Sequence, residues 1–153
     1  MPRGLLRRKR GVRLYHAVRE NRIADIETRP APFPLPAPQP NVIDYVEIPS
    51  RDLTKTRAFF ESFFAWQFTD YGPEYTAFKD GRLSGGFFKS STVAQTANGS
   101  ALIVFYSPQL EATRDRAREL GKTLTRDIFS FPRGRRFQFT EPGGSEFAIW
   151  SDH

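Results

Sequence analysis

The sequence predicts an α+β fold made of two βαβββ modules, because a strand–helix unit occurs twice along the chain. The segment at residues 43–66 has a fainter copy 57 positions later. In both copies an apolar strand runs into a serine and then into a helix. The matching identities are Ser50 with Ser107, Leu53 with Leu110, Thr56 with Thr113, and Arg57 with Arg114.

The helical pattern of the two copies is the second observation. Positions three and four residues apart share one face of a helix. The expected inward positions are Leu53, Thr56, Phe60 and Phe63 in the first copy, and Leu110, Thr113, Ala117 and Leu120 in the second. The first helix also carries an aromatic stripe of Phe59, Phe60, Phe63 and Phe64. Such a stripe is typical of a buried core, so we expect it to form the core of the first module.

The elements of the first module follow from alternation and from turn residues. Residues 42–48 alternate as a strand, with Ile43, Tyr45 and Glu47 on one face. Ser50 or Asp52 is expected to cap a helix that runs to about residue 64. Three short strands are expected next, at residues 66–71, 74–79 and 83–88. A polar loop at 90–99 links the two modules.

The second module repeats this order of elements. A strand is expected at 100–106, and Ser107-Pro108 predicts a helix start, with a capping hydroxyl before a proline at the first helical position. Gly121 is expected to end that helix in a left-handed conformation. The last three strands are expected at residues 123–128, 134–140 and 145–150.

Charge separates a basic extension from a neutral domain. Residues 1–40 hold nine Lys and Arg against three acids, 9 − 3 = +6, which is the whole net charge of the 153-residue chain. The alternating prolines of 29–40 predict an extended spacer, and we expect residues 1–40 to be a disordered extension of the domain at 41–153. The extension is interpreted as a solvated tail, a start assigned too far upstream, or a contact for an anionic partner. Because the domain itself is formally neutral, nucleic-acid binding is not expected.

Residue types missing from the sequence exclude several classes of site. The chain has no cysteine, which excludes disulfides and thiolate metal sites. Its two histidines are His16 and His153, so the domain lacks the histidine of a Ser-His-Asp triad. No phosphate-binding glycine loop is present. No apolar run approaches the length of a membrane span, and a cytoplasmic location is expected.

The domain resembles the vicinal oxygen chelate superfamily, also known as the glyoxalase/bleomycin resistance protein/dioxygenase superfamily. The resemblance implies two βαβββ modules, at about 41–89 and 100–151, that form a cupped mixed sheet with the helices packed outside. It also implies a homodimer. The family includes lyases, isomerases, ring-cleaving dioxygenases, antibiotic-inactivating thiol transferases and metal-free drug-binding proteins. The residues that carry the resemblance are 44–68, 83–88, 107–121 and 139–150.

The resemblance also implies where a divalent metal would be held. Its ligand positions fall on Tyr45, near Ala77, on Leu102 and on Ala148, and none of these side chains binds a metal in the usual way. The acids expected nearest are Glu47 and Glu146, and two carboxylates would hold a hard ion weakly at best. The sequence therefore predicts no metal and no cofactor.

Strand alternation selects the residues that would line the cup. The resulting surface is an aromatic wall with a few polar groups, and it suits a small, partly aromatic or cationic organic ligand. Purely structural roles stay open, such as an ion pair of Arg136 with Glu146 or stacking of Arg136 on Trp150. The predicted ligand-binding residues are Tyr45, Glu47, Leu102, Tyr106, Arg136, Gln138, Glu146 and Trp150.

Three functions follow from this inventory. The first is a metal-independent small-molecule-binding protein of the glyoxalase/bleomycin resistance type. The second is a lyase, isomerase or transferase of the same superfamily. It would need either an unusual carboxylate site of Glu47 and Glu146 or metal-free acid–base chemistry by Glu47 with Tyr45, and no catalytic residue is assigned. The third is an accessory module whose basic extension docks on an acidic partner.

Overall fold

The computed structural model describes residues 37–153, and residues 43–153 form one compact unit. The disordered extension predicted for residues 1–40 falls largely outside the described residues. That prediction and the domain boundary at residue 41 therefore stay predictions.

The first module has the predicted βαβββ order. Its sheet has the strand order β1-β4-β3-β2, in which β1 is parallel to β4 and the other neighbours are antiparallel. The predicted strands are each found within three residues of the expected ends. The elements are β1 (Tyr45–Ser50), α2 (Leu53–Phe64), β2 (Gln67–Asp70), β3 (Tyr75–Lys79) and β4 (Ser84–Lys89).

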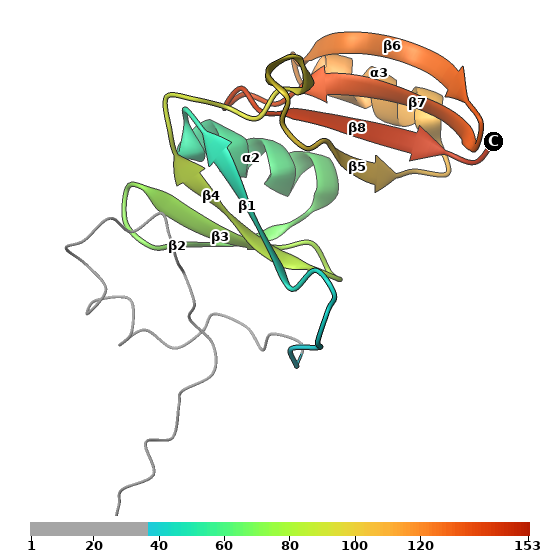
Figure 1. The fold of residues 1–153 in the computed structure, drawn as a ribbon. Coiled ribbons are helices and arrows are strands. Elements are labelled where there is room, and N and C mark those ends of the chain that lie inside the picture. Colours follow the sequence, from blue (N-terminus) through green and yellow to red (C-terminus); the bar gives the residue numbers. More distant parts are fainter. Residues whose placement is uncertain (1–36) are drawn as a thin grey trace, which may run out of the picture. The chain divides into compact units, whose positions relative to one another are not determined.

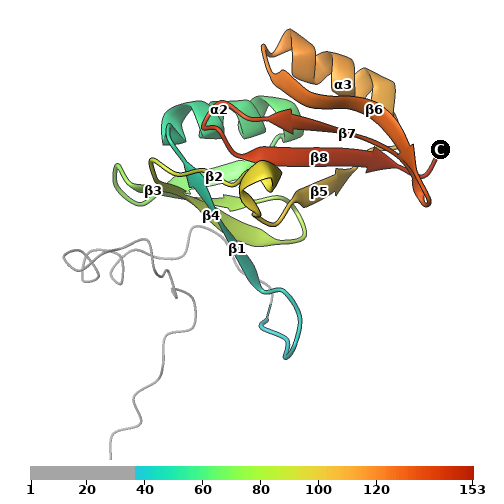
Figure 2. The ribbon, with the colours of Figure 1, turned by 45° about the horizontal axis from the view of Figure 1, so that its top comes forward.

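The second module repeats this topology with the strand order β5-β8-β7-β6, and β5 is parallel to β8. Each module thus contributes its own four-stranded mixed sheet and one helix, as Figures 1 and 2 show, and the predicted α+β fold of two βαβββ modules is confirmed. The elements are η1 (Thr96–Asn98) in the linking loop, then β5 (Ile103–Tyr106), α3 (Leu110–Glu119), β6 (Thr123–Phe131), β7 (Gly134–Thr140) and β8 (Glu146–Ser151).

The repeat seen in the sequence has the same local structure in both modules. Ser50 Oγ lies 2.8 Å from Thr56 Oγ1, and Ser107 Oγ lies 2.7 Å from Thr113 Oγ1. Both serines also accept the backbone N–H two residues further on. Each serine therefore turns the chain from its strand into its helix, and the matching threonine anchors that turn.

An ion pair is repeated as well. Arg57 Nη1 lies 2.5 Å from Asp70 Oδ2, and Arg114 Nη1 lies 3.4 Å from Asp127 Oδ1. Arg114 lies 57 positions after Arg57, and Asp127 lies 57 positions after Asp70. The repeat therefore extends from the helix into the strand that follows it. In the first module this pair connects α2 with β2, and in the second module it connects α3 with β6.

The helix ends are confirmed in two places and corrected in one. Asp52 caps α2 by accepting the Lys55 N–H at 3.0 Å. The predicted start of the second helix at Ser107-Pro108 is wrong, because α3 begins at Leu110 with Gln109 as its N-cap. The Ser107 hydroxyl bonds Thr113 and the Gln109 N–H, so it supports the turn before the helix.

Gly121 ends α3 as predicted, with a left-handed φ of 73°. The Gly121 N–H donates to Arg118 O at 2.8 Å, and the Lys122 N–H donates to Ala117 O at 3.1 Å. This pair of bonds is the Schellman arrangement, which favours glycine at the left-handed position. Leu120 lies at the turn and is 37% exposed, so its predicted inward position is wrong.

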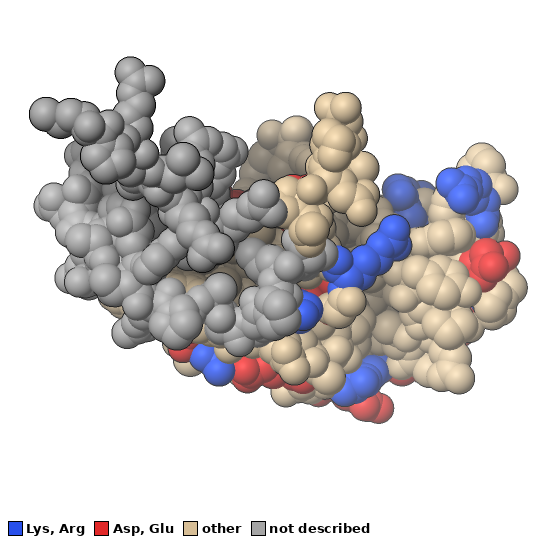
Figure 3. All heavy atoms as spheres, turned by 90° about the horizontal axis from the view of Figure 1, so that it is seen from below, with Lys and Arg blue, Asp and Glu red and all other residues tan. Residues whose placement is uncertain are grey.

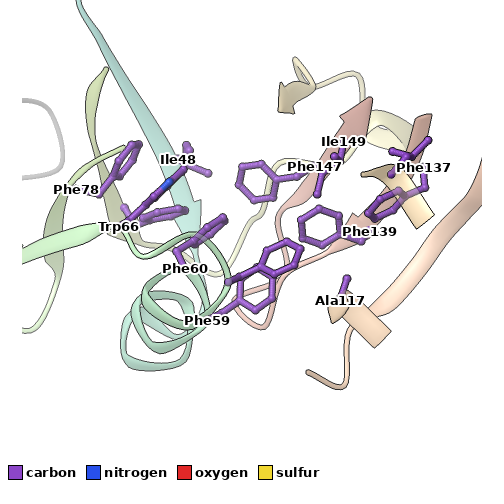
Figure 4. Close-up of a cluster of buried hydrophobic side chains, with 13 residues drawn as sticks. Ile48, Phe59, Phe60, Trp66, Phe78, Ala117, Phe137, Phe139, Phe147 and Ile149 are labelled. Atoms are coloured by element: carbon purple, nitrogen blue, oxygen red, sulfur yellow. The ribbon is translucent and has the colours of Figure 1, made fainter. Parts of the chain in front are cut away.

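The aromatic stripe of α2 forms a core that both modules share. Phe60 stacks on Trp66 at 4.5 Å between ring centroids and lies 5.4 Å from Phe87, both in the first module. Phe60 is also 5.3 Å from Phe147 of β8. Figure 4 shows Phe59 and Phe60 of α2 between the side chains of the two sheets. The prediction that this stripe forms the core of the first module is therefore confirmed, and the stripe also packs against the second module.

A buried carboxylate joins the two modules. Glu141, in the turn between β7 and β8, accepts hydrogen bonds from the Thr56 hydroxyl at 2.8 Å, from the Gly143 N–H at 2.8 Å and from the Ser145 N–H at 3.2 Å. Because the Thr56 proton is directed to Glu141, the Ser50 hydroxyl donates in turn to Thr56. Burial raises the pKa of Glu141 above its usual range, and these hydrogen bonds oppose that rise.

Backbone contacts complete this joint. The Arg51 N–H donates to Gly143 O at 2.9 Å, and the Ser145 hydroxyl donates to Pro49 O at 2.6 Å. A methyl group on Gly143 would collide with the hydroxyls of Ser50 and Thr56, so only glycine fits there. The corresponding turn of the first module, at Asp80, is exposed, so the two copies have diverged at this turn.

We expect Thr56→Val to lower the free energy of unfolding by about 1–3 kcal/mol, because it removes a donor from buried Glu141 and the acceptor of Ser50. Thr113→Val is the matched control, since its partly exposed site allows water to replace the lost bond, and its loss should be smaller. Chemical denaturation of both variants measures the difference. Equal losses would contradict the assignment of Glu141 as the joint.

Candidate functional site

The second sheet turns one face toward the core and the other away from it. Phe137, Phe139, Phe147 and Ile149 pack with Ala117 of α3, as Figure 4 shows. Their strand neighbours point to the opposite side. We call that side the open face of the second sheet, and it carries Val104 and Tyr106 of β5, Phe129 of β6, Arg136 and Gln138 of β7, and Glu146, Ala148 and Trp150 of β8.

One row of cross-strand neighbours runs across the whole open face. In register order it consists of Phe129, Arg136, Trp150 and Tyr106. The Arg136 guanidinium carbon lies 5.1 Å from the Phe129 ring centroid. Tyr106 and Trp150 meet edge to face at 5.3 Å between centroids. The row thus places one cation between aromatic rings.

The side chain of Arg136 makes no hydrogen bond and no ion pair within the described residues 37–153. Its Nε is buried and has no partner, while its guanidinium faces the rings of Phe129 and Phe131. The ion pair with Glu146 that the sequence left open is therefore wrong. Its other alternative, stacking on Trp150, is not found either, because the Arg136 guanidinium lies over Phe129 and Phe131 while Arg133 lies over Trp150.

Glu146 is instead held by donors from three segments. Its Oε2 accepts from the backbone N–H of Thr96 at 2.8 Å and from the Thr96 hydroxyl at 2.7 Å. Its Oε1 accepts from Thr125 Oγ1 and from Gln138 Nε2, each at 3.0 Å. Burial alone would raise the pKa of Glu146, but these hydrogen bonds outweigh it and hold the pKa below its usual range. Glu146 is therefore ionised at neutral pH.

Leu102, one of the predicted ligand-binding residues, lies outside the strands. β5 begins at Ile103, three residues later than predicted, and Leu102 is a half-buried residue of the loop before it. Side chains alternate within β5: Ile103 and Phe105 pack on the core, while Val104 and Tyr106 are exposed.

Tyr45 and Glu47 belong to the first sheet, where a third residue connects them. The Tyr75 hydroxyl donates to Glu47 Oε1 at 3.2 Å and lies 2.8 Å from the Tyr45 hydroxyl, which therefore donates to it. Gly86 permits this arrangement, since any side chain there would collide with the Tyr75 ring. Burial, with smaller effects of Tyr45 and Glu47, raises the pKa of Tyr75 far above its usual value, so the phenol stays neutral.

The structure thus gathers the predicted residues into two groups on two sheets. Tyr45 and Glu47 form one group through Tyr75. The other predicted residues within strands share the open face of the second sheet, where they occupy neighbouring positions. The second group consists of Tyr106, Arg136, Gln138, Glu146 and Trp150.

Four contributing residues were missed by sequence reasoning. Tyr75 could have been predicted from the sequence, since alternation places it on the same face as Ala77. Phe129 lies just beyond the predicted end of its strand at residue 128. Thr96 comes from the linking loop, and Thr125 sits beside a register shift in β6, so neither carried a periodic signal.

The side chains at the expected ligand positions do not fit a metal. A phenol, two alkyl side chains of alanine and one of leucine stand there, at Tyr45, Ala77, Ala148 and Leu102. In residues 37–153 no group of three or more His, Cys, Asp or Glu side chains lies close enough to hold an ion. The two acids that remained as candidates, Glu47 and Glu146, lie in different sheets and have different donors.

Two surface properties bear on partners. Over the described part of the chain, no helix is long and apolar enough to cross a membrane. On the face that Figure 3 shows, basic and acidic side chains are interspersed over the described residues. This mixture agrees with the neutral formal charge of residues 41–153.

Comparisons with known proteins agree with this architecture. The family model described as Glyoxalase/Bleomycin resistance protein/Dioxygenase superfamily matches residues 42–149. A structure of lactoylglutathione lyase from Agrobacterium tumefaciens is similar at 19% identity and a TM-score of 0.57, with 73% of this chain and 94% of that chain covered. No curated protein matches the chain.

Two further solved structures share the fold. The fosfomycin resistance protein FosX from Listeria monocytogenes is 18% identical with a TM-score of 0.62, and 74% of this chain and 94% of that chain are covered. A glyoxalase/bleomycin resistance protein/dioxygenase family enzyme from Burkholderia phytofirmans is 17% identical with a TM-score of 0.60, and 72% and 100% are covered. At these identities the likeness concerns the fold alone.

The depressed pKa of Glu146 predicts a pH-dependent contribution to stability. A carboxyl whose folded pKa lies below its unfolded value stabilises the fold above about pH 4.3, and the contribution is lost as the pH falls. The difference in unfolding free energy between wild type and Glu146→Gln should therefore be larger at pH 7 than at pH 3. Urea denaturation at both pH values measures it, and a constant difference would count against the ionised state of Glu146.

Proposed function

The chain belongs to the glyoxalase/bleomycin resistance protein/dioxygenase superfamily, and on that premise we propose that it binds a small organic molecule without a metal. The proposed site is the open face of the second sheet. The observation that carries the proposal is Arg136, a cation that lies among aromatic rings and whose buried Nε has no hydrogen-bond acceptor. Side chains arranged in this way recognise a ligand directly.

Exposure of aromatic and apolar surface supports this site. Tyr106 is 52% exposed and Val104 is 42% exposed, and both project from β5 on the open face. Large apolar side chains gathered on one exposed surface are typical of binding sites. Gln138 adds a polar group in the next row, where its amide is held in place by Glu146.

An enzyme of the same superfamily is the second candidate, and the first sheet favours it. The hydroxyls of Tyr45 and Tyr75 and the carboxylate of Glu47 form a continuous hydrogen-bonded chain. Such a chain can move a proton without a metal. The solved structures of a lactoylglutathione lyase and a fosfomycin resistance protein show that this fold occurs in proteins with those names.

The assembly and location are also proposals. We propose a homodimer, supported by the outermost position of β1 and β5 in their sheets and by the exposed Val104 and Tyr106 on β5. A cytoplasmic location is proposed on the sequence alone. The accessory role of the basic extension stays a prediction, since that extension lies largely outside the described residues.

The binding proposal is tested with Trp150 as the reporter. The chain has two tryptophans, and Trp66 is buried in the core. In Trp66→Phe, Trp150 is therefore the only emitter. Compounds from a metabolite and antibiotic panel that raise the melting temperature of the wild type should also change Trp150 emission.

Trp150→Ala should weaken binding of any such compound roughly tenfold or more, because a buried aromatic contact contributes about 1.5–3 kcal/mol. The matched control is Trp66→Phe, which should keep the wild-type affinity. Compounds that stabilise the protein without affecting Trp150 emission, and bind Trp150→Ala as tightly, would remove the open face from the proposal.

A further inference from the structure

We propose that the ligand carries a carboxylate joined to a planar ring, and that Arg136 binds the carboxylate while the neighbouring aromatic side chains contact the ring. This inference rests on the proposed binding function of the open face and specifies the class of its ligand. It is carried by the buried Nε of Arg136, which has no hydrogen-bond acceptor, by the donors around Glu146, and by the order of residues in the cross-strand row.

Three arginines of the second module have acidic partners, and Arg116 donates to the backbone carbonyl of Ser62. Arg114 and Arg118 pair with Asp127. Arg135, next to Arg136 but on the opposite face of β7, pairs with Glu111. Arg136 is not paired, although a guanidinium has five N–H donors and its Nε is buried. A buried donor without an acceptor is costly, so this position favours a ligand that supplies acceptor oxygens.

Glu146, the acid on the same face, does not supply acceptor oxygens to Arg136. Both oxygens of Glu146 are engaged by Thr96, Thr125 and Gln138. Glu146 therefore neither neutralises Arg136 nor offers a free carboxylate to a cation. Of the ligand types considered from the sequence, the structure favours an aromatic ligand over a cationic one, and the unpaired charge on this face is positive.

Two further arginines place positive charge beside the cross-strand row. The Arg126 guanidinium lies over the Phe129 ring at 3.4 Å, and the Arg133 guanidinium is 5.8 Å from the Trp150 ring. Neither forms an ion pair within the described residues. An anion that approaches the row meets three guanidiniums, of which Arg136 is the central one and has the buried Nε. A planar carboxylate fits a guanidinium through two parallel hydrogen bonds.

The other residues of the row indicate why the ligand would carry a planar ring. Trp150 is the direct cross-strand neighbour of Arg136, and exposed Tyr106 is the next one. A carboxylate on Arg136 would therefore place its attached ring beside these two aromatic side chains. Aromatic rings favour offset-stacked or edge-to-face contacts at such distances.

The test uses three probes that separate charge from shape. They are 2-naphthoate, the neutral 2-naphthamide of the same shape, and acetate. The readout is the side-chain Nε–H signal of Arg136 in ¹H–¹⁵N spectra, assigned by its absence in Arg136→Lys. We expect 2-naphthoate to shift this signal and to bind at least tenfold more tightly than either other probe, a factor of ten being about 1.4 kcal/mol.

Two variants complete the experiment. Arg136→Lys keeps the positive charge but loses the planar fork, and it should weaken 2-naphthoate about tenfold. Arg118→Gln is the control, because it removes a positive charge on α3 and should leave the affinity unchanged. Backbone amide spectra confirm that both variants are folded.

Equal binding of 2-naphthamide and 2-naphthoate, or unchanged affinity in Arg136→Lys, would overturn the anionic ligand while leaving the proposed binding function intact. A failure of 2-naphthoate to shift the Arg136 signal at millimolar concentration would also overturn it. The binding function itself is decided separately, by the panel and the Trp150 reporter.

Discussion

The structure depends on one helix face that serves two sheets. Phe59 and Phe60 of α2 contact Phe139 and Phe147 of the second module, and Phe60 also stacks against the first. Burial of these rings commits one face of each sheet to the interior. Side chains alternate along a regular strand, so the buried residues determine which of their neighbours face outward. Arg136 and Trp150 face outward for this reason, and so does Glu47.

The two modules have kept the same scaffold but not the same surface. Their serine–threonine pairs and helix–strand ion pairs are equivalent. On the first sheet the outward side chains close on each other through the Tyr75 hydroxyl. On the second sheet Glu146 is satisfied by protein donors, and Arg136 is left without an acceptor. The difference makes the second sheet the better candidate for ligand recognition.

Periodic features of the sequence predicted the fold well, and long-range contacts explain what it missed. The 57-residue repeat predicted both modules, and Gly121 marked the end of its helix correctly. The Ser107-Pro108 start failed because the hydroxyl bonds a residue within the helix. Two donors of Glu146, Thr96 and Thr125, come from a loop and an irregular strand, which no periodicity reveals. That α2 is shared between the modules is likewise a tertiary property.

We propose that this member of the superfamily recognises its ligand with side chains alone, because alkyl and phenol groups stand where metal ligands would be expected. The most direct measurement is elemental analysis of the purified, untagged protein by inductively coupled plasma mass spectrometry. The account predicts transition metals well below one ion per chain. Zinc, nickel, manganese or iron at one ion per chain, bound between the modules and required for ligand binding, would contradict it.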